Sequence, residues 1–195
     1  LVRPFVLAPA STRPDVEQAL AIVEEVRSIK ERIDAKMVKR GHKQRNVKLG
    51  GGGIREIEFF VQTIQVIAGR RLQGILDRGT IGSLMRLHHA GILSLKQQGG
   101  LTRAYQFLRD VEHKLQMVHD LQTHALPDRQ DKLERCAIRM GYTGVSRSAA
   151  LKQFQADHFA HRTVVHDIFH SFFETPKASA MLKRTFQLIG QTAVK

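Results

Sequence analysis

The residues with the clearest chemical potential lie in residues 48–62, KLGGGGIREIEFFVQ. Glycine has no Cβ, so a run of glycines permits positive φ angles and lets a ligand or another backbone come close. The helix expected to follow starts with N–H groups that lack an intrahelical partner, which favours an anion. Charged side chains flank this turn. Lys48 and Arg55 are cations that attract a phosphate, and Glu56 and Glu58 are carboxylates that could orient these cations or hold a metal. The stretch therefore predicts a phosphate-handling corner.

The alternative interpretation of the same residues is a flexible hinge followed by an amphipathic helix, because glycine runs are common in linkers. The glycine spacing fits neither the Walker pattern nor the dinucleotide-binding fingerprint. Spacing alone therefore leaves both interpretations open.

A second informative stretch is residues 101–123, in which apolar positions recur at helical spacing. Arg109, Glu112 and His113 occupy adjacent positions of that helix. Groups of this kind can form a satisfied network, which is costly to bury when it is only half made. We therefore expect these three side chains to act together.

Both stretches resemble the bifunctional glutamine synthetase adenylyltransferase/adenylyl-removing enzyme family. KLGGGGIREIEF is similar to the K-L-G-R-G-G-I-R-E-I-E-F run in the N-terminal half of that family, with Gly51 in place of the usual arginine. Residues 109–127 are similar to its R-x-V-E-H-x-L-Q and Q-T-H-x-L-P patterns. Two matches in the right order are far more specific than one. The resemblance covers most of residues 1–174, and a similar glycine-rich corner occurs in the more distant PII uridylyltransferase.

The resemblance implies an enzyme that attaches AMP from ATP to glutamine synthetase and removes it by phosphorolysis of adenylyl-tyrosine, releasing ADP. It also implies Mg²⁺ and ATP or ADP as cofactors, with glutamine synthetase and the PII signalling protein as partners. The family draws its catalytic carboxylates from a G-S-x-D-x-D type strand, and the 195 residues contain no such motif. No catalytic residue and no metal site is therefore expected in this chain. It looks like the helical part that follows the catalytic domain in the adenylyl-removing half.

On this basis we expect the glycine-rich corner to form one wall of an active site whose chemistry lies outside the chain. The residues expected to position phosphate or the carboxylates are Lys48, Gly50, Gly52, Gly53, Arg55 and Glu58. We expect Arg109, Glu112 and His113 to support the helix predicted over residues 54–68 from its other side. The glycine at position 51 removes one cation from this corner.

The elements that must position these residues are helices. Apolar residues at spacings of three and four predict helices over residues 15–39, 54–68, 80–89, 101–123, 131–140 and 148–174. The predicted fold is an all-α helical bundle with short extended segments near the N-terminus, at residues 1–7 and 47–49, left over from a preceding nucleotidyltransferase domain. The expected divisions are a connector over 1–49, the bundle over 50–176 and a basic helix or linker over 177–195.

Charge is the strongest feature of the composition, because 31 Lys and Arg outnumber 18 Asp and Glu and give a net charge of +13. Such a surface attracts nucleic acid, nucleotides, anionic lipid or an acidic protein. The alternative function is therefore a stand-alone basic helical module that binds nucleic acid or an acidic partner. Aromatic residues are only 6% of the chain, which disfavours a stacking platform for single-stranded nucleic acid.

The remaining features bear on compartment and on metal binding. With the single cysteine Cys136 no internal disulfide forms, which fits a cytoplasmic protein. Apolar runs are too short to cross a membrane, no signal peptide is recognised, and a start at Leu1 indicates a fragment. His166 and His170 have the spacing of two helical metal ligands, but without a third ligand we expect surface or network histidines.

Overall fold

The structure is a computed structural model that describes residues 16–39, 45–68, 73–119 and 124–173. Six α-helices and one short 3-10 helix occur in these ranges: α1 (Val16–Lys39), α2 (Ile54–Ala68), η1 (Gln73–Ile75), α3 (Thr80–His89), α4 (Leu95–His119), α5 (Gln130–Arg139) and α6 (Arg147–Phe173). The described ranges contain no strand, only an isolated antiparallel bridge between Asn46 and Ala125. The predicted all-α class is confirmed.

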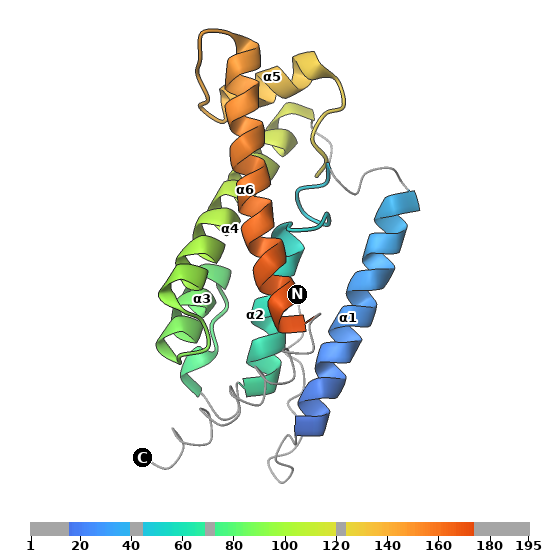
Figure 1. Cartoon of the computed structure of the whole chain (residues 1–195), viewed down its shortest axis with the longest axis vertical. Helices are drawn as coiled ribbons and strands as arrows, with labels where there is room; N and C mark the ends of the chain where they lie inside the picture. The colour runs from blue at the N-terminus through green and yellow to red at the C-terminus, as the bar shows by residue number, and fades with distance from the viewer. Residues whose placement is uncertain (1–15, 40–44, 69–72, 120–123, 174–195) are drawn as a thin grey trace.

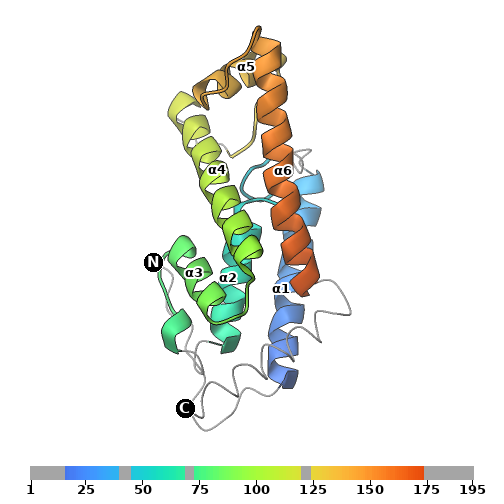
Figure 2. The same ribbon diagram turned by 60° about the vertical axis from the view of Figure 1, so that its left-hand side comes forward.

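The two longest helices, α4 and α6, run antiparallel and form the main helix pair of the bundle (Figures 1 and 2). Helix α5 lies across one end of this pair, and α3 packs against α4. Helix α2 contacts α1, α3, α4 and α6, so it is the central helix of the bundle. The corner that leads into α2 is therefore fixed to the middle of the molecule.

The central place of α2 follows from its composition, because apolar residues cover most of its circumference. Its buried apolar side chains are Ile54, Ile57, Phe60, Val61, Ile64, Ile67 and Ala68. Phe60 meets Phe172 of α6 edge to face, with ring centroids 4.8 Å apart. An apolar helix of this kind is stable only when other helices cover it.

Helix α4 begins at Leu95, six residues before the start that the apolar pattern predicts. Gly99 and Gly100 lower the helix propensity of this segment, so the apolar pattern does not predict its first turn and a half. Ser94 and Gln97 form a capping box: the Gln97 N–H donates to Ser94 Oγ at 3.2 Å, and the Ser94 N–H donates to Gln97 Oε1 at 2.9 Å. A Cβ at Gly100 would lie 3.0 Å from Val164 Cγ1, so the glycine permits close packing of α4 on α6.

Residues 47–49 form a turn and not the extended segment that we predicted. The Asn46 side chain accepts hydrogen bonds from the N–H groups of Lys48 and Leu49, at 3.0 and 2.7 Å. Such Asx turns compete with extended structure. The extended piece predicted at residues 1–7 and the segment 177–195 lie outside the described residues. No helix within the described ranges has both the length and the apolar character needed to cross a membrane.

Candidate functional site

A pair of backbone hydrogen bonds brings the two motif-bearing stretches together. The Val47 N–H donates to His124 O at 2.9 Å, and the Leu126 N–H donates to Arg45 O at 2.8 Å. The segment before the glycines therefore lies beside the segment that follows α4. Residues that are almost eighty positions apart in sequence meet at one place.

The glycine-rich corner, residues 47–53, is closed by its own backbone hydrogen bonds. The Gly50 N–H donates to Asn46 O at 3.0 Å, and the Gly53 N–H donates to Gly50 O at 2.9 Å. At the start of α2, the Ile54 N–H donates to Val47 O at 3.1 Å and the Arg55 N–H to Lys48 O at 3.0 Å. We expected free N–H groups at this helix start to attract an anion. That expectation is wrong for the N–H groups of Gly53, Ile54 and Arg55, because each already donates to a backbone carbonyl.

Helix α6 holds the corner from outside. Gly52 has a φ of +69°, and a Cβ there would lie 2.1 Å from the carbonyl oxygen of Arg162. The Arg162 Nε donates to Gly51 O at 2.8 Å. Gly52 is therefore required both for its backbone conformation and for the close approach of α6. The corner is a packed joint, which does not agree with the alternative of a flexible hinge.

Lys48 belongs to a cluster around one buried carboxylate, which we call the Glu112 cluster: Lys48, Arg109, Glu112 and His124. The Glu112 side chain is only 3% exposed. Its Oε1 lies 3.3 Å from Lys48 Nζ and 2.9 Å from His124 Nδ1, while Arg109 donates a hydrogen bond to its Oε2. Two cations share one carboxylate, so the cluster keeps positive charge at the edge of the corner.

The cluster contains two of the three residues that we expected to brace α2. Arg109 and Glu112 come together, but His113 is exposed and takes no part in the cluster. The histidine beside the carboxylate is His124, which sequence reasoning did not select. Its place in the Q-T-H-x-L-P pattern was the signal that could have identified it.

Arg55 and Glu58 lie on the outer side of α2. Arg55 NH1 is 3.5 Å from Glu58 Oε2, and the guanidinium stacks 4.9 Å from the centroid of the Phe59 ring. The Arg55 side chain is 44% exposed. It also borders a shallow recess together with Leu49 and Gly50. Arg55 is thus a cation that a bound molecule can reach.

Glu56 is buried, although its neighbour Arg55 is exposed. Its side chain is 5% exposed, and its Oε1 lies 3.1 Å from Lys30 Nζ of α1. Burial raises the pKa of the Glu56 carboxyl, and the charge of Lys30 opposes that rise. This ion pair joins α1 to α2, so Glu56 has a structural use.

The Mg²⁺ that the resemblance implies does not fit the residues described. No group of three or more His, Cys, Asp and Glu side chains within the described ranges is arranged to hold a metal ion. His166 and His170 are exposed on α6 with ring centroids 5.8 Å apart. No step of a reaction can be assigned to a metal held by these residues.

Comparison with known proteins adds a family and several relatives. A family model described as GlnD PII-uridylyltransferase matches residues 27–173. The chain is 46% identical over 127 residues to a bifunctional glutamine synthetase adenylyltransferase/adenylyl-removing enzyme of Agrobacterium fabrum, a match that covers 63% of this chain and 13% of the relative. Enzymes with the same name are 47% identical over 127 residues in Mesorhizobium japonicum, covering 63% and 13%, and 54% identical over 97 residues in Bradyrhizobium diazoefficiens, covering 50% and 10%. The chain thus spans a small part of these relatives.

Proposed function

Because the chain belongs to the GlnD PII-uridylyltransferase family, we propose that its glycine-rich corner and the Glu112 cluster form one wall of a nucleotidyl-transfer site. The observation that carries this proposal is the ion pair between Lys48 and Glu112, 3.3 Å long, which joins the two motif-bearing stretches. Arg55 extends the same positive edge toward solvent. The wall supplies fixed positive charge for a phosphate.

The protein to which this chain belongs adds AMP to glutamine synthetase and removes it again. The names of the relatives support this activity. The carboxylates that bind metal lie outside this chain, and Mg²⁺, when bound by them, neutralises charge on the phosphates. ATP, ADP and phosphate are the small molecules involved. Glutamine synthetase and the PII signalling protein are the protein partners, and the cytoplasm is the expected compartment.

The residues of this chain act by position and charge. Arg55, half exposed, attracts a phosphate oxygen and aligns it with a charge-assisted hydrogen bond. Lys48, held by Glu112, adds a second cation whose place is fixed before the ligand arrives. Gly52, locked under Arg162, keeps the start of α2 from moving. Such preorganised charge is a large term in catalysis of phosphoryl and nucleotidyl transfer.

Two other functions are less well supported. Uridylyl transfer to PII fits the family description, but the relatives named above are adenylyltransferases. A stand-alone basic module for nucleic acid rests on charge alone, and similarity to these enzymes does not favour it. Strong, salt-sensitive binding of the chain to generic DNA would be the observation that revives it.

The proposal is tested by removing the exposed cation in the full-length enzyme. Arg55→Ala should lower the rate of phosphorolysis of adenylylated glutamine synthetase by about tenfold or more, as loss of one charge-stabilising group does. Lys48→Ala should lower it as well. The measurement is the rate of ADP formation at saturating phosphate.

Arg27→Ala is the matched control, because Arg27 is 41% exposed and pairs with Glu24 at the same i,i+3 spacing, 3.2 Å apart, on α1. This variant should keep the full rate. The circular dichroism spectra of all three variants should match that of the unchanged enzyme. An Arg55→Ala enzyme as fast as the Arg27→Ala enzyme would remove the proposal.

A further inference from the structure

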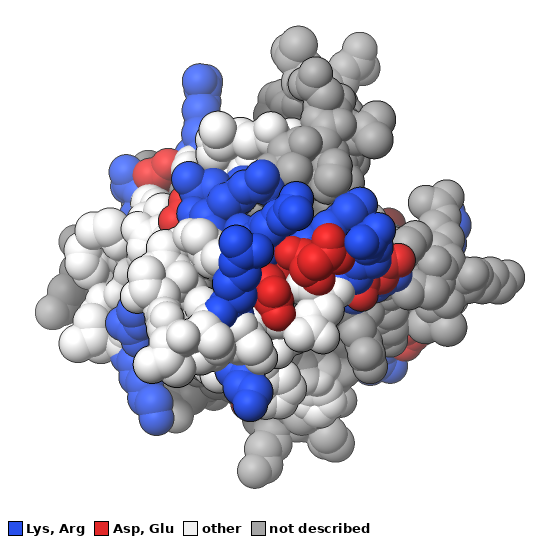
Figure 3. Space-filling view, turned by 90° about the horizontal axis from the view of Figure 1, so that it is seen from above, with Lys and Arg blue, Asp and Glu red and all other residues white. Residues whose placement is uncertain are grey.

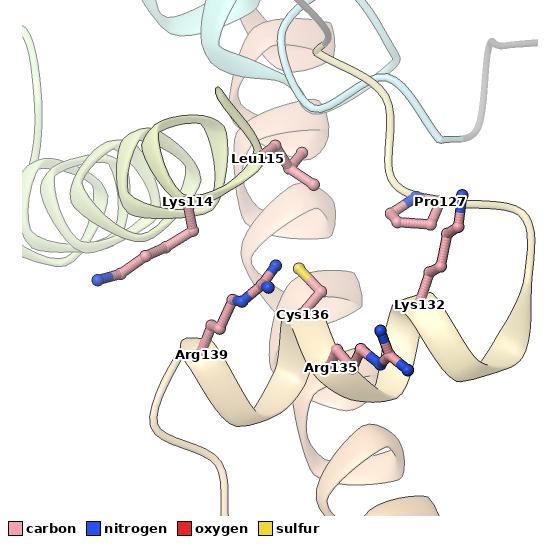
Figure 4. Close-up of a pocket in the computed structure, with 7 residues that line it drawn as sticks. All are labelled: Lys114, Leu115, Pro127, Lys132, Arg135, Cys136 and Arg139. Atoms are coloured by element: carbon pink, nitrogen blue, oxygen red, sulfur yellow. The ribbon is translucent and has the colours of Figure 1, made fainter. Parts of the chain in front are cut away.

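A pocket lies at the end of the molecule where α5 crosses the α4 and α6 pair. It has a volume of about 100 Å³ and opens between the last turns of α4, the segment after it and one face of α5 (Figure 4). The residues that line it are Lys114, Leu115, Pro127, Lys132, Arg135, Cys136 and Arg139. None of them belongs to the Glu112 cluster or to the glycine-rich corner, so the pocket is a separate site.

The rim of the pocket is positively charged. Four of its seven lining residues are Lys or Arg, and none of the four forms an ion pair within the described residues. The acidic side chains of α5 form their short contacts outside the rim: Asp131 pairs with Arg129 at 3.0 Å, and Glu134 accepts a hydrogen bond from Gln130 at 3.0 Å. The charge of Asp131 also acts on Arg135, but without an ion pair. Lys and Arg side chains gather across this end of the molecule in Figure 3, with Asp and Glu side chains among them.

The floor of the pocket is apolar. Leu115 and Cys136 are buried, at 3% and 5% exposed, and Pro127 closes the side opposite Lys114. Burial raises the pKa of the Cys136 thiol, so the floor carries no negative charge that would neutralise the rim. An unpaired charged rim over an apolar floor suits a ligand that has an anionic end and an organic body.

We propose that this pocket binds the phosphate group of a small molecule. The two guanidinium groups, Arg135 and Arg139, leave α5 one turn apart and can each donate two parallel hydrogen bonds to phosphate oxygens. Lys114 and Lys132 lie on opposite sides of the pocket, where they add to the positive potential around it (Figure 4). The source of the phosphate is either the free ion or a nucleotide whose base rests on the apolar floor.

The test is a nuclear magnetic resonance titration of the 195-residue chain with inorganic phosphate and, separately, with ADP. The proposal predicts saturable shifts of the backbone amides of α5 with at least one of the two probes. Arg135→Gln/Arg139→Gln should weaken that binding by about tenfold or more, since each charged hydrogen bond contributes on that scale. Tighter binding of ADP than of phosphate identifies a nucleotide as the source, and equal binding identifies the free ion.

The matched control is Lys36→Gln/Lys96→Gln, which removes the same charge from exposed positions on α1 and α4 that do not line the pocket. Its affinity should equal that of the unchanged chain. Equal weakening in both double variants would overturn the proposal, because only diffuse charge would then be acting. An absence of saturable shifts in α5, or tighter binding of a poly-glutamate peptide than of ADP, would overturn it too.

Discussion

Glu112 is the residue on which the candidate site depends. A carboxylate that is 3% exposed is stable as an ion only when cations and hydrogen bonds compensate its lost hydration. Here the compensation comes from two segments, through Lys48 before α2 and Arg109 on α4. Loss of Lys48 therefore disturbs Glu112 as well as any ligand. Arg55, whose partner Glu58 stays partly solvated, gives the cleaner test.

His158 provides a test of the interior at the scale of one residue. The side chain is 8% exposed, and its ring lies 5.8 Å from that of Phe154 and 6.4 Å from that of Phe107. Burial, followed by the charges of Arg162 and His161, lowers the pKa of His158 to about 4. The folded protein thus holds this imidazole neutral at pH values where the unfolded chain protonates it.

The consequence for stability has a definite sign. Since the folded pKa lies below the unfolded one, the contribution of His158 is complete above pH 6.5 and is lost as the pH falls toward about 4. The free energy of unfolding should fall by about 1.4 kcal/mol per pH unit in that window from this residue. His158→Leu should remove this part of the slope in urea unfolding measured from pH 7 to pH 4.

His113→Leu is the control, because His113 is exposed. The free energy of unfolding of the His113→Leu variant should have the same pH dependence as that of the unchanged chain. That dependence includes the contribution of other groups such as Glu56. Equal slopes in the His158→Leu variant and the control would contradict the account of His158 as a neutral, buried ring.

At the scale of elements, the contact between the glycine-rich corner and α6 contains two neighbouring glycines, Gly51 and Gly52. We expect substitution by alanine to affect stability differently at the two positions. Gly52 has a φ of +69° and faces the Arg162 carbonyl, whereas a Cβ on Gly51 would meet nothing within 4 Å. Gly52→Ala should therefore destabilise the protein by about 2 kcal/mol or more. Gly51→Ala should change the free energy of unfolding by less than about 1 kcal/mol.

Urea unfolding of both variants measures this difference. A similar loss of stability in the two would show that glycine is needed for chain flexibility in general, not for the contact with α6. The open surroundings of Gly51 also leave room for the arginine that the resembled family usually has there. The departure at this position is thus compatible with the same backbone.

The sequence predicted most helices well and the contacts between them poorly. The apolar spacing located α1, α2, α3, α5 and α6 to within two residues at the ends that the structure describes. Ser146 caps α6, because its Oγ accepts a hydrogen bond from the Ala149 N–H at 3.1 Å. Apolar spacing reports which face of a helix is buried but not what covers it. It therefore could not show that α6 seals Gly52 or that Glu56 turns inward to Lys30.

The candidate site divides in the same way. Lys48, Arg55 and Glu112 could be selected because they lie in the two stretches that resemble the patterns of the adenylyltransferase family. His124 stands in the Q-T-H-x-L-P pattern, but its contact with Glu112 could not be predicted, because it depends on the bridge between Asn46 and Ala125, which joins residues that are far apart in sequence. The occupied N–H groups at the start of α2 likewise depend on a turn that the Asn46 side chain holds through two hydrogen bonds.

At the scale of the whole molecule, the bundle presents positive charge at two separate places. The net charge of +13 draws anions toward the chain in general, while the Glu112 cluster with Arg55 and the α5 pocket are the two places that we propose for binding them. The matched region is 13% of the length of relatives such as the Agrobacterium fabrum enzyme. The bundle therefore corresponds to a small part of these relatives, and on our proposal the catalytic carboxylates come from elsewhere.

The most direct test of the account is a crystal structure of the full-length enzyme with ADP bound. The account predicts that a phosphate oxygen of the nucleotide at the metal-binding carboxylates lies within hydrogen-bonding distance of the Arg55 guanidinium, on the side of α2 that carries the glycine-rich corner. A nucleotide at those carboxylates with Arg55 and Lys48 turned toward solvent on another side of the bundle would contradict it.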